Sequence, residues 1–594
     1  MCMTTIQYQI SPVNPNSHLF DVTLSFDCQP NVPYTLTLPA WLPGSYMVRD
    51  FAKNIVEIQA SNIQDEVVEL TKIDKQSWSI TPQDDKVIIN YHVFAFDLSV
   101  RTAYLDNQRG FFNGSSTFLA VKELADSPCQ LTINAPESKS NWRVATGMTR
   151  AIGTEKYSFG QYQASNYQEL IDCPVAIGEF DSTEFIVEGV THHVVFTSKH
   201  YGDTNRLAND LTKLCQHHIN LFGEAPFSEY WFITHLLENG FGGLEHKNST
   251  ILQASRFDLA SPAKPDELTD NYKTFLSLCS HEYFHAWNVC RIKPKELTPY
   301  NLSKEVYTEQ LWAYEGITSY YDDFSLYRAG IIDFEDYLQL ISKTATRVNR
   351  GTGQLKQSVS ESSYYTWTKF YQQGADAPNN IVSYYTKGAL IALWLDLTIR
   401  EYSSGQYSLD NLMKELWIHF GRPGVGTQVD DFINIVNILC QHDLTGEINA
   451  LLHDKAPIAL TDKLANVGVA YQQVPFKSLN TIETADNTDV QPFIGALTKQ
   501  LSIGVKVTQI LEHSPAANAG LAVNDVIIAV DSLKASHKSL QALANHLPTA
   551  QMVSCHFLRD DQLITSEICF IDSPNNGVRL SLVDVEQAKK WQSH

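Results

Sequence analysis

The sequence predicts a multidomain α+β protein, with an all-β part over residues 1–175, an α+β part with many helices over 176–465 and a compact unit over 490–575. Three observations support this prediction. A chain of 594 residues is longer than one hydrophobic core usually supports, so several domains are expected. Short runs of alternating apolar and polar residues fill the first part. From about residue 205 the apolar residues recur with a helical period.

The N-terminal part reads as a series of short strands. The runs "HLFDVTLSFDC", "PYTLTLPAWLP" and "DKVIINYHVFAF" alternate, and proline, asparagine and aspartate separate them. These features predict a β-sandwich-like domain.

The middle part reads as helices from "TNRLANDLTKLCQHHINLFG", which ends on a glycine stop signal, to "VDDFINIVNILCQHDLTGEINALLHD". Two histidine pairs, at 192–193 and 217–218, lack ligand-spaced neighbours and are expected at the surface. The polar stretch "KSLNTIETADNTDVQ" reads as a linker before the last unit.

Charge and composition exclude several functions. The formal net charge is −22 and no lysine- or arginine-rich block occurs, so nucleic acids and anionic membranes are not expected partners. Neither an export signal nor a run of about 18 apolar residues is present. The ten cysteines form no CxxC pair, which favours reduced thiols and a cytoplasmic location.

The stretch "SHEYFHAWN" contains the strongest chemical signal. A helix is expected from Tyr272 to Val289, and at 3.6 residues per turn it places His281 and His285 on one face. Chance would produce an HExxH pattern in this chain about 0.03 times. The spacing therefore predicts a metal site rather than two ordinary core histidines, with Glu282 as the base that takes a proton from the attacking water.

A catalytic zinc site normally takes a third protein ligand and keeps one position for water. The next helical segment, "EVYTEQLWAYEGITSYYDDFSLYRAG", offers three glutamates. Glu315 has apolar neighbours, whereas Glu305 and Glu309 lie among polar ones. Because a carboxylate buried without a cation is costly, Glu315 is the predicted ligand. Two imidazoles and a carboxylate suit zinc among the divalent ions.

"SHEYFHAWN" followed by "LWAYEGITSYYDD" resembles the glycyl aminopeptidase family, which belongs to the gluzincin group of thermolysin-like zinc peptidases. The resemblance implies a thermolysin-like domain over 176–465 and one zinc ion per chain held by His281, His285 and Glu315. Most gluzincin aminopeptidases place the glutamate nearer to the second histidine than the thirty residues found here. A longer loop changes closure entropy only slowly, so the site tolerates the insertion.

Two more stretches resemble elements of related aminopeptidases. "NGFGGLEHKNST" matches an exopeptidase signature, which implies that Glu245 accepts the substrate ammonium while Gly242 and Gly243 let the substrate approach the backbone. "NNIVSYYTKGALIALWLDL" matches a tyrosine-x-lysine-glycine element and implies that Tyr385 donates a hydrogen bond to the oxyanion. The adjacent Tyr384 is the alternative donor.

The last unit is similar to a PDZ domain, a module that the glycyl aminopeptidase family also carries. A PDZ groove takes an extended peptide against a sheet edge and holds its C-terminal carboxylate with backbone amides. The segment "PFIGALTKQ" is the expected carboxylate loop.

Taken together, these features predict a zinc-dependent aminopeptidase that acts on peptides with a free N-terminus, and the resemblance implies a preference for glycine or alanine. Two alternatives stay open. One is an endopeptidase or other hydrolase that uses the same site. The other is a non-enzymatic adaptor whose function is PDZ binding. The oligomeric state is not predicted.

Overall fold

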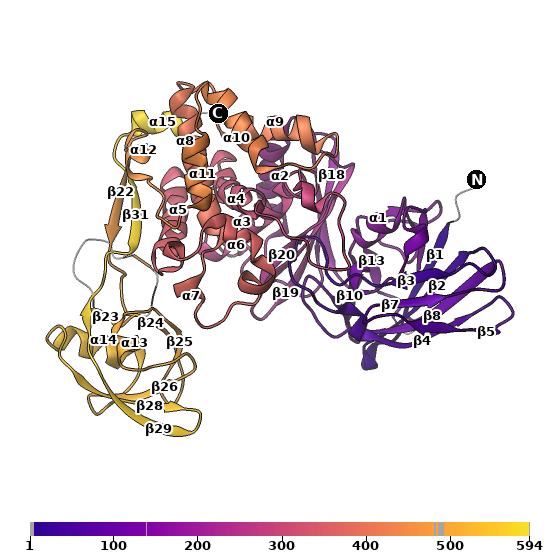
Figure 1. The fold of residues 1–594 in the computed structure, drawn as a ribbon, viewed down its shortest axis with the longest axis horizontal. Helices are drawn as coiled ribbons and strands as arrows, with labels where there is room; N and C mark the ends of the chain where they lie inside the picture. The colour runs from indigo at the N-terminus through magenta and orange to yellow at the C-terminus, as the bar shows by residue number, and fades with distance from the viewer. Residues whose placement is uncertain (1–4, 138, 480, 482, 485–491, 593–594) are drawn as a thin grey trace. The chain divides into compact units, whose positions relative to one another are not determined.

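The computed structural model describes residues 5–137, 139–479, 481, 483–484 and 492–592. The chain divides into two compact units. One consists of Met1–Val306 with His419–Gly426, and the other of Tyr307–Ile418 with Thr427–His594. Figure 1 shows the early strands in indigo and purple, the main helices in magenta to orange and the last strands in yellow.

The N-terminal part is almost entirely β-structure, which confirms the prediction. An eight-stranded sheet has the order β14-β15-β12-β1-β2-β8-β4-β5, and two four-stranded sheets have the orders β13-β16-β10-β9 and β11-β3-β7-β6. Alternate residues of β1 and β2 are buried, as the period of two requires. The strands are β1 (Ile6–Asn14), β2 (Leu19–Asp27), β3 (Tyr34–Thr37), β4 (Ile55–Ser61), β5 (Val67–Val68), β6 (Leu70–Lys72), β7 (Ser77–Ile80), β8 (Lys86–Phe94), β9 (Ala103–Leu105), β10 (Arg109–Phe112), β11 (Ala120–Val121), β12 (Cys129–Ile133), β13 (Arg143–Ala145), β14 (Thr149–Arg150), β15 (Gly160–Ala164) and β16 (Val175–Gly178).

A five-stranded sheet follows the short helix α1 (Tyr167–Ile171) and strand β16, with the order β17-β18-β19-β21-β20. Strands β18, β19 and β21 are parallel, and β20 pairs antiparallel at one edge. Helix α3 packs on β20, β21 and α2. These elements are β17 (Asp181–Val187), β18 (Val190–Phe196), α2 (Thr204–Phe222), β19 (Glu229–Leu237), β20 (Phe241–Glu245), β21 (Ser249–Ser255) and α3 (Asp270–Phe284).

The helical part of the second unit surrounds α8, whose residues are almost all buried. Helices α4, α5, α6 and α10 pack against α8. The helices are α4 (Ile317–Arg328), α5 (Phe334–Asn349), α6 (Val359–Tyr364), α7 (Ala377–Asn380), α8 (Tyr384–Tyr402), α9 (Leu409–Leu416), α10 (Val429–Cys440), α11 (Thr445–His453) and α12 (Thr461–Ala465).

Short turns of other helix types interrupt these elements. The π-helical turns are Trp312–Gly316, Thr366–Phe370 and Trp417–Gly421. The 3₁₀ turns are Pro15–Ser17, Phe51–Asn54, Gly114–Ser116, Lys122–Leu124, Lys295–Leu297 and Gly353–Leu355. The helix expected from Glu305 begins only at Leu311, so that prediction is wrong for its first residues.

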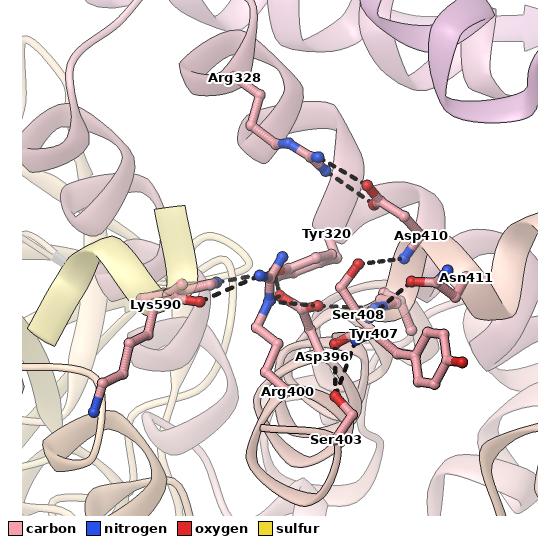
Figure 2. Close-up of polar contacts among 12 residues, drawn as sticks. Tyr320, Arg328, Asp396, Arg400, Ser403, Tyr407, Ser408, Asp410, Asn411 and Lys590 are labelled. Atoms are coloured by element: carbon pink, nitrogen blue, oxygen red, sulfur yellow. Dashed lines mark hydrogen bonds and ion pairs between the residues drawn. The ribbon is translucent and has the colours of Figure 1, made fainter. Parts of the chain in front are cut away.

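Buried charges along α8 form a hydrogen-bonded network (Figure 2). Arg400 donates from Nε to both carboxylate oxygens of Asp396, at 3.1 Å each. The hydroxyl of Tyr320 donates to Asp396 at 2.8 Å, and the amide of Leu409 donates to it at 2.9 Å. Because four donor contacts reach the Asp396 carboxylate, its charge is stabilised inside the core.

The same network reaches the C-terminal helix α15 (Val585–Gln592). Arg400 donates to the backbone carbonyl of Lys590 at 3.3 Å (Figure 2), and the Trp591 indole donates to the Tyr320 hydroxyl at 3.3 Å. Trp591 is fully buried among aromatic rings of α4 and α5. Helix α15 is therefore anchored in the helical core.

The PDZ-like unit lies in sequence between two paired strands, β22 (Val469–Val474) and β31 (Gly577–Leu582). Its order of strands and helices agrees with the predicted compact unit, and 480, 482 and 485–491 of the expected linker lie outside the described residues. Its elements are β23 (Pro492–Phe493), β24 (Ala496–Gln500), β25 (Val505–Ile510), α13 (Pro515–Asn518), β26 (Val526–Val530), β27 (Leu533–Lys534), α14 (His537–His546), β28 (Val553–Arg559), β29 (Gln562–Ile568) and β30 (Ile571–Asp572).

Among the described residues, no helix combines the length and apolar character that crossing a membrane requires. The nine described cysteines are free thiols, and all but Cys569 are buried.

Candidate active site

Helix α3 carries the HExxH pattern. The Thr269 hydroxyl caps its first turn by accepting from the amide of Tyr272 at 3.2 Å. The helix ends at Phe284, five residues before the predicted end at Val289. His285 nevertheless keeps helical angles, φ −60° and ψ −20°, and its amide donates to the carbonyl of His281 at 3.2 Å. The two imidazoles therefore stay one turn apart on one face.

The two imidazoles converge. Nε2 of His281 lies 3.0 Å from Nε2 of His285. Two ligands of a tetrahedral zinc ion, each about 2.0 to 2.1 Å from the metal, lie about 3.3 Å apart. Nδ1 of His285 lies 2.8 Å from the carbonyl oxygen of Asn288, which selects the tautomer with its proton on Nδ1. The lone pair of Nε2 is then left for a metal.

A tight turn after α3 supplies the carbonyl that orients His285. Val289 has a φ of +100°, a region that β-branched residues rarely adopt and that costs about 1–3 kcal/mol. The turn is held because the amide of Cys290 donates to the His285 carbonyl at 3.1 Å and that of Val289 to the Ile292 carbonyl at 2.9 Å. Sequence reasoning missed this role because the HExxH pattern gives no signal for a backbone contact.

Glu315 lies in the π-helical turn Trp312–Gly316 and is only 2% exposed. The ligand atoms of His281, His285 and Glu315 lie within 4.8 Å of one another. Glu305 and Glu309 are exposed, unlike Glu315. Two imidazole nitrogens and one carboxylate fit the donor set of a catalytic zinc ion, and π-helical turns are frequent at functional sites.

Glu282 points from α3 toward the edge strand β20. A methyl group added at Gly243 would lie 2.0 Å from its Oε1, so only glycine leaves room for this carboxylate. Gly242 is needed for a different reason, since its φ is +146° while no atom lies within 4 Å of its missing Cβ. Glu282 therefore lies directly against the edge to which an extended peptide can pair.

Glu245 ends the same strand, at the antiparallel edge. It is 7% exposed, and a Cβ at Gly44, whose φ is +80°, would lie 2.4 Å from its Oε2. A cavity of about 50 Å³ adjoins this carboxylate, with Val289, Cys290 and Tyr300 among its walls. The structure thus gives Glu245 a buried position beside a small cavity.

The two candidate oxyanion donors at the start of α8 differ in their surroundings. Tyr384 is fully buried, its hydroxyl lies 2.9 Å from Oγ1 of Thr366, and burial raises its pKa. Tyr385 is partly exposed and stacks on Phe370, with ring centroids 5.5 Å apart. Tyr385 is therefore the more exposed residue of the two. Lys387 of the same element is buried and donates to the Ala456 carbonyl at 3.0 Å, and burial lowers its pKa to about 8.

Two glycines allow α8 to approach the turn that carries Glu315. A Cβ at Gly316 would lie 2.5 Å from the Cα of Gly388, and a Cβ at Gly388 would lie 2.8 Å from both the Cα of Gly316 and the carbonyl oxygen of Trp312. The glycine of the tyrosine-x-lysine-glycine element is therefore required by backbone packing.

Gly388→Ala is expected to lower the free energy of unfolding by about 1–3 kcal/mol, because the backbone atoms it meets must move apart. The midpoint of thermal or urea unfolding measures this. Gly446→Ala is the matched control, since Gly446 lies in the exposed first turn of α11 with no atom within 4 Å of an added Cβ, and its helix should be unchanged or slightly stabilised. Equal midpoints for both variants would contradict the packing role.

The prediction that the paired histidines lie at the surface is wrong. His192 and His193 of β18 and His218 of α2 are buried, and only His217 is partly exposed. Nε2 of His192 lies 2.8 Å from the Tyr283 hydroxyl and Nε2 of His218 lies 3.0 Å from Oγ of Ser280. Burial lowers the pKa of His192 to about 4, so it stays neutral. These histidines hold α3 in place from two neighbouring elements.

Three protein families match segments of the sequence. They are the peptidase M61 N-terminal domain over residues 7–179, the M61 glycyl aminopeptidase over 274–391 and the PDZ domain over 492–569. A crystal structure of an aminopeptidase N family protein from Idiomarina loihiensis is 44% identical, covering 99% of this chain and 100% of that one, with a TM-score of 0.96.

The chain belongs to the M61 glycyl aminopeptidase family. It is a peptidase with a C-terminal PDZ domain, and the resemblance seen in its sequence is confirmed. This M61 chain is also similar to the M1 zinc metallopeptidase from Deinococcus radiodurans, at 11% identity over 77% of this chain and 96% of that one, with a TM-score of 0.48. A search of curated proteins found no match.

Proposed function

We propose that this M61 chain is a zinc-dependent aminopeptidase that hydrolyses the N-terminal peptide bond of peptides. One zinc ion would be held by His281, His285 and Glu315. The observation that supports this most directly is the convergence of their ligand atoms within 4.8 Å, with Glu282 next to the first ligand in the sequence. When bound, zinc supplies a Lewis acid that polarises the carbonyl and makes water more acidic.

Glu282 acts as the proton carrier in this proposal. Its carboxylate lies against Gly243 on the strand edge where the scissile bond would be placed. It takes a proton from the attacking water as the new C–O bond forms. It then delivers that proton to the amine nitrogen as the C–N bond breaks, so no other proton source is needed.

Glu245 determines which peptide bond is cleaved. Its buried carboxylate would pair with the substrate ammonium, and Gly242 and Gly243 of the same strand allow the substrate backbone to lie close to β20. A fixed ammonium leaves only the first peptide bond at the reacting position. The enzyme would therefore remove one residue at a time.

Tyr385 would stabilise the oxyanion by donating a hydrogen bond from its hydroxyl. The burial of Tyr384 and the contact of its hydroxyl with Thr366 favour Tyr385 as the donor. Such a donor contributes most when negative charge appears on the carbonyl oxygen.

The preference for glycine or alanine that the family resemblance implies is also part of this proposal, and the small size of the cavity beside Glu245 supports it. Its volume of about 50 Å³ has room for a few water molecules or a short side chain. Pockets that hold larger ligands usually measure about 300–1,000 Å³.

The requirement for a free N-terminus tests the role of Glu245. Alanine arylamide is expected to be hydrolysed with a kcat/KM at least about 100-fold above that of its N-acetyl form, because the acetylated nitrogen carries no charge. Glu245→Gln should lower kcat/KM for the free amine by a similar factor, while the exposed Glu238→Gln serves as the control. Equal cleavage of acetylated and free substrates would instead favour an endopeptidase.

We further propose that the PDZ domain binds a peptide C-terminus. Strand β24 lies at a sheet edge, and the loop before it contains Gly495 with a φ of +72°, as a carboxylate-binding loop of backbone amides requires. Leu479 of this chain already packs in the PDZ core, and its amide donates to Gln541 of α14 at 3.3 Å. An incoming peptide would therefore meet this segment of the chain beside α14.

We also propose domain limits near residues 175 and 465 and over 490–575, and a cytoplasmic location. The change from β16 to the five-stranded sheet and the end of α12 at Ala465 support the first two limits. Free, mostly buried thiols suit a reducing compartment.

A further inference from the structure

The second unit contains a cavity of about 310 Å³ that the proposed chemistry does not use. Its walls come from the end of α5, from the turns after it, from the start of α8 and from β25 of the PDZ domain. The volume is large enough for several side chains or for the end of a short peptide. The lining residues that matter are Arg347, Arg350, Phe370, Ser383, Thr386 and Gln509.

Two arginines give this cavity its charge. Arg347 is exposed and Arg350 is half-buried, and no aspartate or glutamate lies among the lining residues. The pKa of Arg350 is lowered by burial and by the neighbouring charge of Arg347. Both arginines line the same cavity, so an anion inside it would be attracted by two guanidinium groups.

Neighbouring carboxylates do not neutralise this pair. No described carboxylate forms an ion pair with Arg347 or Arg350, and Arg350 instead donates to the side chain of Gln509. The nearby Glu512 is already paired with Lys356 at 2.6 Å. The protein has a net charge of −22, so a cavity lined by two arginines without ion-paired carboxylates has the opposite sign of charge from the protein as a whole.

The cavity adjoins the proposed oxyanion donor. Ser383 caps α8 by accepting from the amide of Tyr385 at 3.2 Å, and both Ser383 and Thr386 line the cavity. Phe370 lines it too and stacks on Tyr385. The positive end of the 19-residue helix α8 faces the same space and adds to its preference for an anion.

We propose that this cavity binds the C-terminal carboxylate of a short peptide substrate through Arg347 and Arg350. The inference rests on the proposed aminopeptidase function and names its substrate class. A peptide whose first carbonyl lies at Tyr385 would have its leaving portion beside the start of α8, where Ser383 and Thr386 line the same cavity as the two arginines. The planar guanidinium matches a carboxylate in a paired, two-point contact.

The PDZ domain contributes to this site through β25. Gln509 accepts a hydrogen bond from Arg350, and Asn379 exchanges hydrogen bonds with the backbone just beyond it, donating to the Ile510 carbonyl and accepting from the Glu512 amide, each at 2.9 Å. These contacts orient Arg350 toward the cavity. Short peptides would thus be recognised partly by residues that the PDZ domain positions.

The test compares trialanine with its C-terminal amide. The wild-type enzyme is expected to show a kcat/KM about 10-fold or more higher for the free acid, since the amide carries no charge. Arg347→Gln with Arg350→Gln should remove this preference and leave hydrolysis of alanine arylamide, which has no carboxylate, unchanged. Arg350→Lys should retain part of the preference, and the exposed Arg422→Gln should retain all of it.

Binding to the Glu282→Gln variant provides a readout without turnover. Calorimetric titration should show trialanine binding about 10-fold more tightly than its amide, and the double arginine variant should bind both equally. Equal affinity for acid and amide in the protein with both arginines, or an acid preference that survives their replacement, would overturn the inference. If the wild-type protein did not hydrolyse alanine arylamide, that result would instead count against the proposed function. A preference for peptides with a penultimate acidic residue rather than a terminal carboxylate would overturn the proposed ligand.

Discussion

Replacing Glu282 by glutamine is expected to lower kcat for alanine arylamide by about 10³-fold or more, with little change in fold. A general base and acid contributes about 10²–10⁴-fold to such a reaction, and in the proposed mechanism one carboxylate performs both transfers. Glutamine keeps the shape of the side chain against Gly243 but accepts no proton. Steady-state kinetics and the thermal unfolding midpoint measure the two effects separately.

The surface variant Glu267→Gln is the control for Glu282→Gln, because Glu267 is exposed and its carboxylate pairs with Lys264 at 3.0 Å. It should retain full activity. If Glu282→Gln were as active as the wild type, another group would have to carry the proton. Glu282→Gln also distinguishes an enzyme from an adaptor, because this substitution would not affect a function that depends only on PDZ binding.

Removal of the metal is expected to abolish hydrolysis. A chelator should reduce activity below about one part in 10³, and one equivalent of zinc should restore it, because the proposed site of His281, His285 and Glu315 would hold one ion. His285→Ala should bind less than about a tenth of an equivalent of zinc and lose activity to a similar degree. Elemental analysis and activity assays on the same samples measure both quantities.

The exposed His453→Ala, at the end of α11, is the matched control and should keep its zinc and its activity. The apo protein should also unfold at a lower temperature than the zinc-loaded one, as binding to the folded state requires. Full activity in a sample shown to contain no metal would contradict the proposed chemistry. If a different divalent ion restored hydrolysis and zinc did not, the proposed ligands would stand and only the identity of the metal would change.

The sequence was most informative where chemistry depends on local spacing. His281 and His285 are four residues apart, so a predicted helix is enough to place them on one face. In the structure their Nε2 atoms lie 3.0 Å apart. The choice of Glu315 over Glu305 and Glu309 followed from its apolar neighbours, and its burial agrees with that choice. The all-β start and the PDZ-like end were predictable from periodicity and turn residues.

Features set by contacts between distant segments were not predictable. The π-helical turn at Glu315 and the approach of Gly316 to Gly388 depend on packing between two segments far apart in sequence. The buried positions of His192 in β18 and His218 in α2 depend on contacts with Tyr283 and Ser280 of helix α3. The prediction that these histidines lie at the surface rested on the absence of ligand-spaced neighbours, which gives no information about hydrogen bonds to hydroxyl groups of distant segments. The His285 tautomer is set by a carbonyl three residues later, and no side-chain pattern signals it.

The pairing of Val474 with Gly577 has a practical consequence for protein engineering. Because the flanking strands β22 and β31 are neighbours, the intervening module can be excised and the strands joined by a two-residue reverse turn. Truncation after the module would be far more damaging, since it would remove β31 and the Trp591 anchor from the helical core. The segment that follows the PDZ domain in sequence thus completes the helical part, and the PDZ domain, although close to the C-terminus, is inserted between β22 and β31.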